Sequence, residues 1–387
     1  MSIQERRIST PSSAEGKDED RRNHGGLLEL SLIVPTFNEV LNIDELVGRV
    51  ETALAGVEWE IVFVDDDSPD GTAEAVRALA RRERRIRCIQ RIGRRGLSSA
   101  CVEGMLASAG RFVAVMDADL QHDERILPQM LEIMRGGTTD VVVGSRYFPG
   151  GGTGDWSKTR EKISRFATNL GRMVLRVDLS DPMSGFFMLR REVMNVSVRR
   201  ISSIGFKILL DILASSPHPL HVQELPYEFR NRFAGESKLD SLVAWEFIVL
   251  VLDKLFGRFI PVRFITFCLV GGLGVFVHLF VVAVLFRWMN VEFIQAQAVA
   301  VVVAMTSNFF LNNLLTYRDR RLRGWGVLRG WISFVVACSV GAMANVGVAG
   351  YLFVSHADWL VSALAGIVIG TVWNYAVTAT YTWSKSR

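Results

Sequence analysis

The chain lacks the sequence patterns that mark several common classes of protein. It has no Gly-x-Gly-x-x-Gly fingerprint and no phosphate-binding loop with its lysine, which argues against a dinucleotide-binding fold and against a P-loop NTPase. Its polar part has no basic stripe interleaved with aromatic residues, so we expect no nucleic-acid partner. Only four of its 387 residues are cysteines, and their spacing fits neither a metal site nor a redox pair: Cys88, Cys101, Cys268 and Cys338.

The first 26 residues contain no apolar run. They are rich in Ser, Arg, Glu and Asp, so they cannot contribute to a hydrophobic core. They also lack the apolar stretch of a signal peptide. We therefore expect residues 1–26 to form a disordered leader on the cytoplasmic side of a membrane.

Long apolar runs are confined to the last third of the chain. Four of them are long enough to cross a bilayer as helices, at about 1.5 Å per residue; they cover roughly 264–286, 293–315, 331–354 and 359–383. The sequence thus predicts an integral membrane protein with an all-α transmembrane domain of four helices over 264–387, preceded by interfacial linker helices over 241–263. Such a domain also offers a surface for forming oligomers.

The basic residues next to these runs predict the orientation in the membrane. They gather before the first run, between the second and third, and after the fourth, whereas the other two connections carry only Arg287 with Glu292 and His356 with Asp358. By the positive-inside rule, both termini and the polar domain face the cytoplasm. The net charge of +4 is then explained by anionic lipid headgroups.

Residues 27–240 alternate short β-branched strands with amphipathic helices, the pattern of an α/β domain with a mostly parallel sheet. Three predicted strands, Leu30–Val34, Ile61–Val64 and Phe112–Met116, each run into a polar loop, and Pro35 is expected to end the first. Ligands of open α/β sheets bind outside the carboxyl ends of the strands. We therefore expect the carboxylates of these loops to face one crevice: Glu39, Asp66, Asp117 and Asp119.

The third loop contains the most informative motif, Asp-x-Asp-x-Gln, at Asp117, Asp119 and Gln121. Mg²⁺ and Mn²⁺ prefer oxygen ligands and are commonly held by one or two carboxylates together with substrate phosphates. The motif therefore suits a divalent metal that carries a diphosphate. The alternative is a polar turn in which Asp119 caps the helix expected near Glu124.

Five motifs in order carry a resemblance to a known family. They are Val34–Glu39, Val64–Thr72, Asp117–His122, Gly144–Tyr147 and Asp181–Phe187, with further matches at Gly205–Lys207 and Arg232–Lys238. Together they resemble the dolichyl-phosphate or polyprenyl-phosphate mannose synthases, which are family 2 glycosyltransferases. The resemblance implies a GT-A nucleotide-sugar-binding domain. The four apolar runs are similar to the GtrA-like membrane domain that accompanies such synthases.

The resemblance implies a role for each matching residue. Those implied to bind the donor, GDP-mannose, are Pro35, Phe37, Glu39, Val64, Asp66, Asp117, Ala118, Lys207, Arg232, Ser237 and Lys238. Those implied to bind the metal, Mg²⁺ or Mn²⁺, are Asp117, Asp119 and Gln121. Those implied to bind the phosphate of the polyprenyl acceptor are Arg146, Arg160 and Ser164, and the catalytic set is Asp119, Arg146 and Arg160. His122 is interpreted as a polar residue at a helix start.

The chemistry of the acceptor agrees with these roles. A phosphate monoester has a second pKa of about 6, so its oxygen is already a nucleophile at neutral pH and needs no strong general base. The site must instead bring two anions together, which requires cations on both sides. Direct displacement would invert the anomeric carbon and give a β-linked mannosyl phosphate.

Three competing functions can be compared with the sequence. A UDP-glucose-dependent polyprenyl-phosphate glucosyltransferase would share the fold. A processive polysaccharide synthase would need a Gln-x-x-Arg-Trp motif, but Arg287-Trp288 lacks the glutamine. A non-catalytic carrier or flippase of lipid-linked sugar need not retain Asp117, Asp119, Arg146 and Lys238.

The apolar tail also contains an internal repeat. Asn308 and Thr316 are eight residues apart, followed by Tyr317, and Asn374 and Thr382 have the same spacing, followed by Trp383. At helical spacing these polar side chains share a face. The repeat predicts either contacts between helices or a lining for the polyprenyl phosphate.

Overall fold

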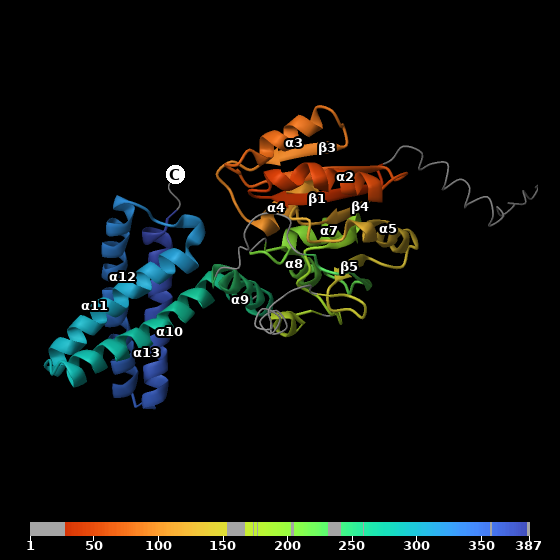
Figure 1. The fold of residues 1–387 in the computed structure, drawn as a ribbon. Coiled ribbons are helices and arrows are strands. Elements are labelled where there is room, and N and C mark those ends of the chain that lie inside the picture. Colours follow the sequence, from red (N-terminus) through yellow and green to blue (C-terminus); the bar gives the residue numbers. More distant parts are fainter. Residues whose placement is uncertain are drawn as a thin grey trace, which may run out of the picture. The chain divides into compact units, whose positions relative to one another are not determined.

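The computed structural model describes residues 28–152, 167–172, 174–175, 177–202, 205–230, 241–257, 259–356 and 358–384. The chain divides into two compact units, Met1–Lys254 and Leu255–Arg387, whose elements are labelled in Figure 1. The predicted leader, residues 1–26, lies outside the described residues.

The first unit is built on one seven-stranded sheet with the order β3-β2-β1-β4-β6-β5-β7. The pairs β1/β2, β1/β4, β2/β3 and β5/β7 are parallel, whereas β6 runs antiparallel to both β4 and β5. The predicted α/β fold with a mostly parallel sheet is confirmed. The strands are β1 (Leu30–Thr36), β2 (Trp59–Asp65), β3 (Ile86–Gln90), β4 (Phe112–Val115), β5 (Val141–Ser145), β6 (Phe187–Arg190) and β7 (Val222–Pro226).

The reversed direction of β6 shapes the edge at which the other strands end. Strands β1, β2, β4 and β5 point the same way, so their carboxyl ends meet at one edge of the sheet. The chain enters β6 from that same edge, because β6 runs in the opposite direction. Residues Asp181–Phe186, which precede β6, therefore lie beside the loops that follow β4 and β5, the two strands that pair with β6.

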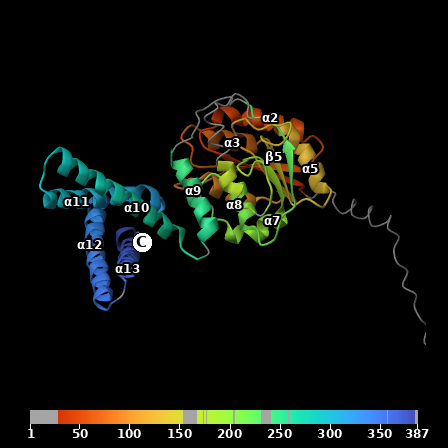
Figure 2. The same cartoon turned by 90° about the horizontal axis from the view of Figure 1, so that it is seen from below.

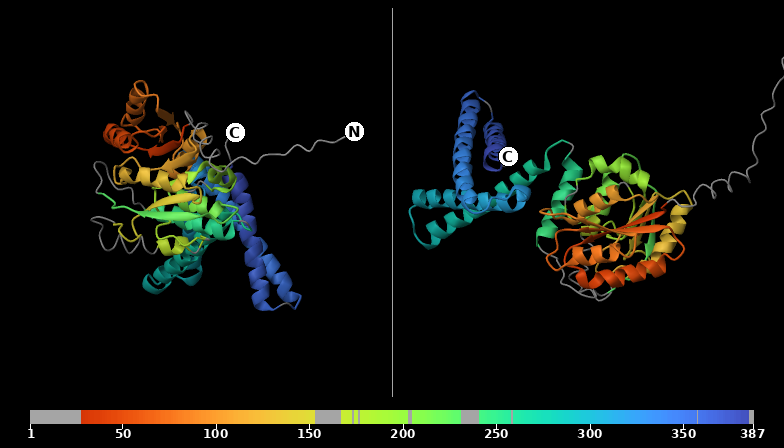
Figure 3. Two further views of the ribbon diagram at one scale, coloured as in Figure 1. Left: turned by 90° about the vertical axis from the view of Figure 1, so that its right-hand side faces the viewer. Right: turned by 90° about the horizontal axis from the view of Figure 1, so that it is seen from above.

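Helices cover both faces of the sheet, as Figures 2 and 3 show. Alternate strand residues point to opposite faces, so Leu32 and Val34 belong to one buried cluster and Ile33 to the other. Helices α2 (Ile43–Ala53), α3 (Thr72–Ala80) and α5 (Leu127–Arg135) pack on the first face, and α4 (Leu97–Ala107), α7 (Arg191–Ser197) and α8 (Ile208–Ser215) pack on the second. Short 3₁₀ turns cover Val40–Asn42, Glu124–Ile126 and Val198–Arg200.

Helix α9 (Ser241–Phe256) follows and packs on α8. Its Leu250 is buried against Leu210 of α8 and against Met183 of the segment before β6. The ammonium of Lys254 lies 2.6 Å from the Asp211 carboxylate, with side-chain exposures of 9% and 0%. The predicted linker, 241–263, therefore begins with a helix that is anchored on the first unit.

Replacing Lys254 with Met should destabilise the first unit by about 3 kcal/mol, because breaking a buried ion pair leaves Asp211 without its lysine. The measurement is thermal unfolding of the full chain in detergent. The matched control is Arg49→Met, which removes the exposed pair with Glu45 and should cost less than about 0.5 kcal/mol. Equal losses in the two variants would contradict the stabilising role of the Lys254–Asp211 pair.

The second unit is helical. Its helices are α10 (Val262–Ala283), α11 (Phe293–Leu311), α12 (Trp325–Val354) and α13 (Trp359–Val377), with π-helical turns at Val284–Trp288, Asn312–Thr316 and Thr378–Thr382 and a 3₁₀ turn at Arg318–Arg320. Among the described residues, three stretches have the length and hydropathy of a membrane span: Val262–Trp288, Phe293–Thr316 and Trp325–Val354. The fourth predicted segment is also helical, as α13 and its π-helical turn.

The sequence repeat corresponds to a structural repeat. Helix α11 and helix α13 both end in a π-helical turn. Asn308 of α11 lies against Gly274 of α10 so closely that a Cβ there would overlap it, and Asn374 of α13 lies in the same way against Gly341 of α12. The hairpins α10–α11 and α12–α13 are therefore equivalent, and these two asparagines lie at contacts between helices.

The ends of the two hairpins meet through aromatic rings. Tyr317 and Trp383, the residues after the two π-helical turns, stack with ring centroids 4.2 Å apart and an angle of 5° between the planes. The indole of Trp383 also donates a hydrogen bond to Asn313 Oδ1 (3.0 Å). The two halves of the repeat are thus joined at equivalent positions.

Candidate active site

Hydrogen bonds join the loops that follow β1 and β2. The amide of Asn38 donates to Ser68 Oγ, and the amide of Glu39 donates to Thr72 Oγ1, both at 3.0 Å. The buried carboxylate of Asp65 in turn accepts from the amide of Ser68 at 2.9 Å. The two loops therefore form one wall at the carboxyl edge of the sheet, and this wall carries Phe37, Glu39 and Asp66.

Strand β1 is longer than predicted. It continues through Pro35 to Thr36, and Pro35 is paired with Val64 of β2. The pairing with β4 ends at Ile33, so beyond that point β1 has a neighbouring strand on one side only. A proline, which has no amide hydrogen, is tolerated in such a position. The prediction that Pro35 ends the strand is therefore wrong. Pro35 and Val64 nevertheless lie near the carboxyl ends of β1 and β2, next to the polar loops.

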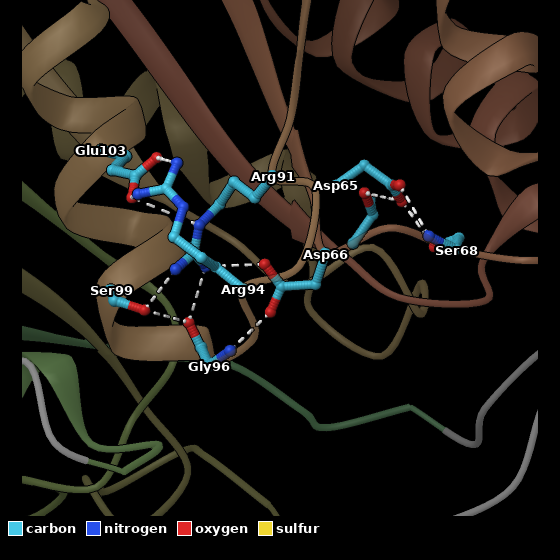
Figure 4. Close-up of polar contacts among 9 residues, drawn as sticks. Asp65, Asp66, Ser68, Arg91, Arg94, Gly96, Ser99 and Glu103 are labelled. Carbon is cyan, nitrogen blue, oxygen red and sulfur yellow. Dashed lines mark hydrogen bonds and ion pairs between the residues drawn. The ribbon is translucent and has the colours of Figure 1, made fainter. Parts of the chain in front are cut away.

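Asp66 is almost completely buried, with 7% exposure, and both of its carboxylate oxygens accept hydrogen bonds. Arg91 Nη1 donates to Oδ1 and the amide of Gly96 donates to Oδ2, both at 2.6 Å, as Figure 4 shows. Burial raises the pKa of Asp66, while the Gly96 amide and the Arg91 guanidinium act in the opposite direction. No sequence pattern pointed to Arg91 as a partner of Asp66.

The Asp-x-Asp-x-Gln motif follows β4 directly. Asp117 is about one-third exposed, whereas Asp119 is buried and its Oδ1 accepts from the amide of Gln121 at 3.2 Å. The alternative in which Asp119 caps the next helix is not realised, because Asp123 accepts from the amide of Arg125 and caps the turn at Glu124–Ile126. The motif is thus held at the carboxyl edge of the sheet without serving as a helix cap.

His122 supports this motif from within the core. Its ring stacks on Phe186 with centroids 5.3 Å apart, and it is 4% exposed. Nδ1 accepts a hydrogen bond from the amide of Asp117 (3.2 Å), so the ring proton lies on Nε2, which is 4.0 Å from Asp117 Oδ2. Burial lowers the pKa of His122 to about 4. At neutral pH the ring is therefore uncharged.

A close approach by Gly185 limits the space beside Asp117. A Cβ at this glycine would lie 3.0 Å from Asp117 Oδ2, tighter than most real contacts. Among the described residues, no group of three or more His, Cys, Asp or Glu side chains could hold a metal. Two carboxylates are nevertheless a sufficient protein contribution for Mg²⁺ or Mn²⁺ when substrate phosphates supply further oxygens. Asp117 and Asp119 therefore fit a divalent metal that arrives with a diphosphate.

Replacing Gly185 with Ala should weaken the metal-dependent sugar transfer that the resemblance implies about 10-fold, because the new methyl group would displace the Asp117 carboxylate. The measurement is the dependence of the transfer rate on Mn²⁺ concentration. The matched control is Gly48→Ala on helix α2, where a Cβ would meet nothing within 4 Å, and this change should leave the rate unchanged while stabilising the helix by about 0.5–1 kcal/mol. An unchanged metal dependence in Gly185→Ala would contradict the expected role of Asp117.

Arg146 and Asp181 form a buried, bidentate ion pair at the same edge of the sheet. Arg146 Nε and Nη2 lie 2.7 and 2.9 Å from the two Asp181 oxygens. Asp181 is fully buried, and its backbone is fixed by Glu224, which accepts from the amides of Ser180 and Asp181. The bonds from Arg146 to Asp181 raise the pKa of the arginine, against the effect of burial, so Arg146 stays cationic.

Lys207 lies close to this pair, at the start of α8. Its ammonium is 3.5 Å from the carbonyl oxygen of Met183, in the segment before β6. Burial and the neighbouring Arg146 cation lower the pKa of Lys207 to about 8, and the carboxylates of Asp181 and Asp117 act in the opposite direction. The edge of the sheet thus combines the acidic motif with two cationic side chains.

The structure brings together most of the predicted site residues that it describes. The loop residues Phe37, Glu39 and Asp66, the motif residues Asp117, Ala118, Asp119 and Gln121, and Arg146 all follow strand ends at one edge. Lys207 reaches the same edge through its contact with Met183, in the segment before β6. The sequence did not predict Asp181 as a partner of Arg146, although Asp181 begins the motif Asp181–Phe187. The predicted residues that lie outside the described ranges are Arg160, Ser164, Arg232, Ser237 and Lys238.

Family models match both parts of the chain. The family described as Glycosyl transferase family 2 matches residues 31–196, and the family described as GtrA/DPMS, transmembrane domain, matches residues 266–383. Among solved structures, the chain is similar to glucosyl-3-phosphoglycerate synthase from Mycobacterium tuberculosis, with 18% identity, a TM-score of 0.44, and coverage of 64% of this chain and 84% of that chain.

Curated relatives match more of the chain. A dolichol-phosphate mannosyltransferase from Pyrococcus furiosus is 36% identical over 92% of this chain and 100% of its own length. The dolichol-phosphate mannosyltransferase of Saccharomyces cerevisiae is 38% identical over 62% of this chain and 93% of its own length. With a GT-A glycosyltransferase domain followed by a GtrA/DPMS transmembrane domain, the chain is a glycosyltransferase and belongs to the dolichol-phosphate mannosyltransferase family.

Proposed function

We propose that this membrane enzyme transfers mannose from GDP-mannose to polyprenyl phosphate with the help of Mg²⁺ or Mn²⁺, with inversion at the anomeric carbon and on the cytoplasmic face. The observation that carries the proposal is the edge of the sheet, where Asp117 and Asp119 stand beside the buried Arg146–Asp181 pair and Lys207. Carboxylates for a metal and cations for phosphates are the groups that a reaction between two phosphorylated substrates requires.

The loops after β1 and β2 would receive the nucleoside of the donor. The Phe37 ring, with the Arg95 guanidinium 4.3 Å from its centroid, would contribute an aromatic surface, and the carboxylates of Glu39 and Asp66 accept hydrogen bonds of the kind that ribose hydroxyls and base edges donate. The metal, when bound at Asp117 and Asp119, would neutralise charge on the diphosphate. Lys207, together with the predicted Arg232, Ser237 and Lys238, would add donors on the same diphosphate.

The acceptor would enter at Arg146. Because Asp181 occupies two of its nitrogen atoms, Arg146 would act as a pre-oriented cation for the lipid phosphate, with the predicted Arg160 and Ser164 beside it. A phosphate oxygen attacks C1 of mannose, the bond from C1 to the β-phosphate oxygen of GDP breaks, and GDP leaves. Attack from the opposite side inverts C1 and yields a β-linked polyprenyl-phosphate mannose.

The cytoplasmic location is supported by the basic connection between α11 and α12. It carries Arg318, Arg320, Arg321 and Arg323, and Arg329 follows within α12, whereas the connections after α10 and α12 are poor in basic residues. The positive-inside rule then places the ends of α11 and α13 on the cytoplasmic side.

The test is transfer of labelled sugar onto polyprenyl phosphate in membranes that contain the full chain, with GDP-mannose and UDP-glucose in parallel, with Mn²⁺ or with a chelator. We expect a mannolipid that needs both GDP-mannose and the metal, and we expect its anomeric configuration to be β. Formation of a glucolipid from UDP-glucose would show that UDP-glucose is the donor instead of GDP-mannose. Product formation in the presence of chelator would overturn the metal requirement. No lipid product from either donor would favour a carrier of lipid-linked sugar.

A further inference from the structure

A short loop between β3 and α4 has both of its ends fixed on Asp66. Arg91, the residue after β3, reaches Asp66 with its side chain, and Gly96, the residue before α4, reaches it with its amide. Figure 4 shows the carboxylate between these two groups. Each oxygen therefore receives one hydrogen bond from the loop, so the rotation of the carboxylate is set by residues outside the loops predicted to bind the donor.

Arg91 is itself held firmly. Its side chain is 2% exposed. Besides Asp66, Nη1 donates to the carbonyl oxygen of Gly96 (3.0 Å) and Nη2 donates to Ser99 Oγ (2.6 Å). Nε lies 3.4 Å from Glu103 Oε1. A guanidinium with a fixed plane can hold a carboxylate in one orientation, which a flexible lysine would do less well.

The environment of Asp66 makes such a partner necessary if the carboxylate is to bind a ligand as an anion. Its burial favours the protonated form, and Arg91 and the Gly96 amide oppose this effect. Without Arg91, the carboxyl group would lose both its fixed direction and a neighbouring positive charge. Arg91 thus combines two properties, charge and orientation, that a receptor for donor hydroxyl or N–H groups requires.

We propose that Arg91 is a positioning residue for donor binding, which fixes the Asp66 carboxylate in the orientation that receives the nucleoside of the donor diphosphate. The inference rests on the donor role of Asp66 in the proposed function. It adds a residue from the end of β3 to the group of predicted donor-binding residues at the ends of β1, β2 and β4. The ligand class is a nucleoside diphosphate, recognised through groups that donate hydrogen bonds to a carboxylate.

The neighbouring Arg94 provides a matched control. It lies in the same loop and pairs with Glu103 through Nη1 at 2.6 Å, but its side chain is 61% exposed. The Arg94 guanidinium donates its hydrogen bonds from Nη1 and Nη2 to the Glu103 carboxylate. Replacing it therefore removes an arginine from the same loop without removing the bond to Asp66.

The experiment measures binding of GDP and of UDP to the full chain in detergent with Mn²⁺, by calorimetry, for wild type, Arg91→Met, Arg91→Lys, Asp66→Asn, the double variant Arg91→Met with Asp66→Asn, and Arg94→Met. We expect Arg91→Met to raise the Kd about 10- to 100-fold, the size typical for a residue that orients a ligand-binding side chain. The double variant should bind no more weakly than Asp66→Asn alone, because the two residues act as one unit.

Two further results are expected. Arg91→Lys keeps the positive charge but loses the planar guanidinium, so its Kd should lie between those of wild type and Arg91→Met. It serves as the test variant if Arg91→Met does not fold. Arg94→Met should stay within about twofold of wild type, as expected for an exposed pair. The KM for polyprenyl phosphate should remain unchanged in all Arg91 variants.

The proposal would be overturned if Arg91→Met or Arg91→Lys lowered the melting temperature but left the Kd unchanged, or if the effects of Arg91→Met and Asp66→Asn multiplied in the double variant. The failure of the proposed function looks different. If wild type binds UDP instead of GDP, the assigned donor is wrong, and the same set of variants titrated with UDP still decides the role of Arg91. Binding of neither nucleotide would overturn both.

Discussion

Asp119→Asn should reduce kcat/KM for mannosyl transfer by roughly 10³-fold, which corresponds to about 4 kcal/mol of transition-state stabilisation. The reason is the loss of one of two carboxylates expected to hold the metal against the donor diphosphate. The substitution keeps the size of the side chain, and an amide oxygen can still accept from the Gln121 amide that Asp119 accepts from now. The fold should therefore survive while the metal is lost.

The measurement is the initial rate of lipid mannosylation at saturating Mn²⁺, with purified full chain in detergent. The matched control is Asp67→Asn, which makes the same chemical change after β2. Asp67 has φ of +59°, a left-handed conformation that Asn tolerates, and its Oδ1 accepts from Gln90 Nε2. We expect the control to keep its rate within about twofold. Retention of more than about a tenth of the wild-type rate by Asp119→Asn would place the metal elsewhere.

Asp181→Ala should have the second large effect, on stability as well as activity. It would leave the Arg146 guanidinium buried without its carboxylate, which typically costs about 3–5 kcal/mol. For a unit of this size, such a loss lowers the melting temperature by about 10 °C. The arginine would also lose the orientation in which it is expected to meet the acceptor phosphate, so the KM for polyprenyl phosphate should rise.

Asp178→Ala is the matched control for this variant. Asp178 stands three positions earlier, is 96% exposed and pairs with the partly exposed Arg172, so its removal should cost less than about 0.5 kcal/mol. A second variant separates stability from function. Arg146→Met combined with Asp181→Ala should recover much of the lost stability, because no unpaired charge remains buried, but it should not recover transfer. Recovery of transfer would show that Arg146 is not needed for the acceptor.

The general arrangement of the site could be predicted because it depends on local patterns. Apolar strands that lead into the loops of Asp66 and Asp117, together with the rule that ligands of such sheets bind outside the carboxyl ends of the strands, were enough to group the carboxylates. The direction of β6 could not be obtained in this way. A four-residue apolar strand carries no signal of its direction, yet that direction brings Asp181 and Gly185 to the site.

The partners of buried charged side chains also could not be predicted from the sequence. Arg91 pairs with Asp66, 25 positions away, and Arg146 pairs with Asp181, 35 positions away. From the sequence alone, an arginine in a polar loop is expected to be a surface residue. Only the fold shows that a carboxylate lies beside it. Pro35 shows the opposite error, since a local rule that ends strands at proline overlooked that β1 has lost one neighbour at that point.

The equivalent hairpins α10–α11 and α12–α13 bear on what the membrane unit can do. A repeat that consists of two antiparallel helices returns the chain to the side from which it began, so both copies have the same sense across a bilayer. Transporters that alternate between outward-open and inward-open states are often built from copies of opposite sense, whose exchange of conformations moves the access path from one face to the other. Two copies of the same sense, joined at one end by the stacked rings of Tyr317 and Trp383, instead make the two faces of the membrane unequal, because the aromatic contact between the copies lies at one end of the helices.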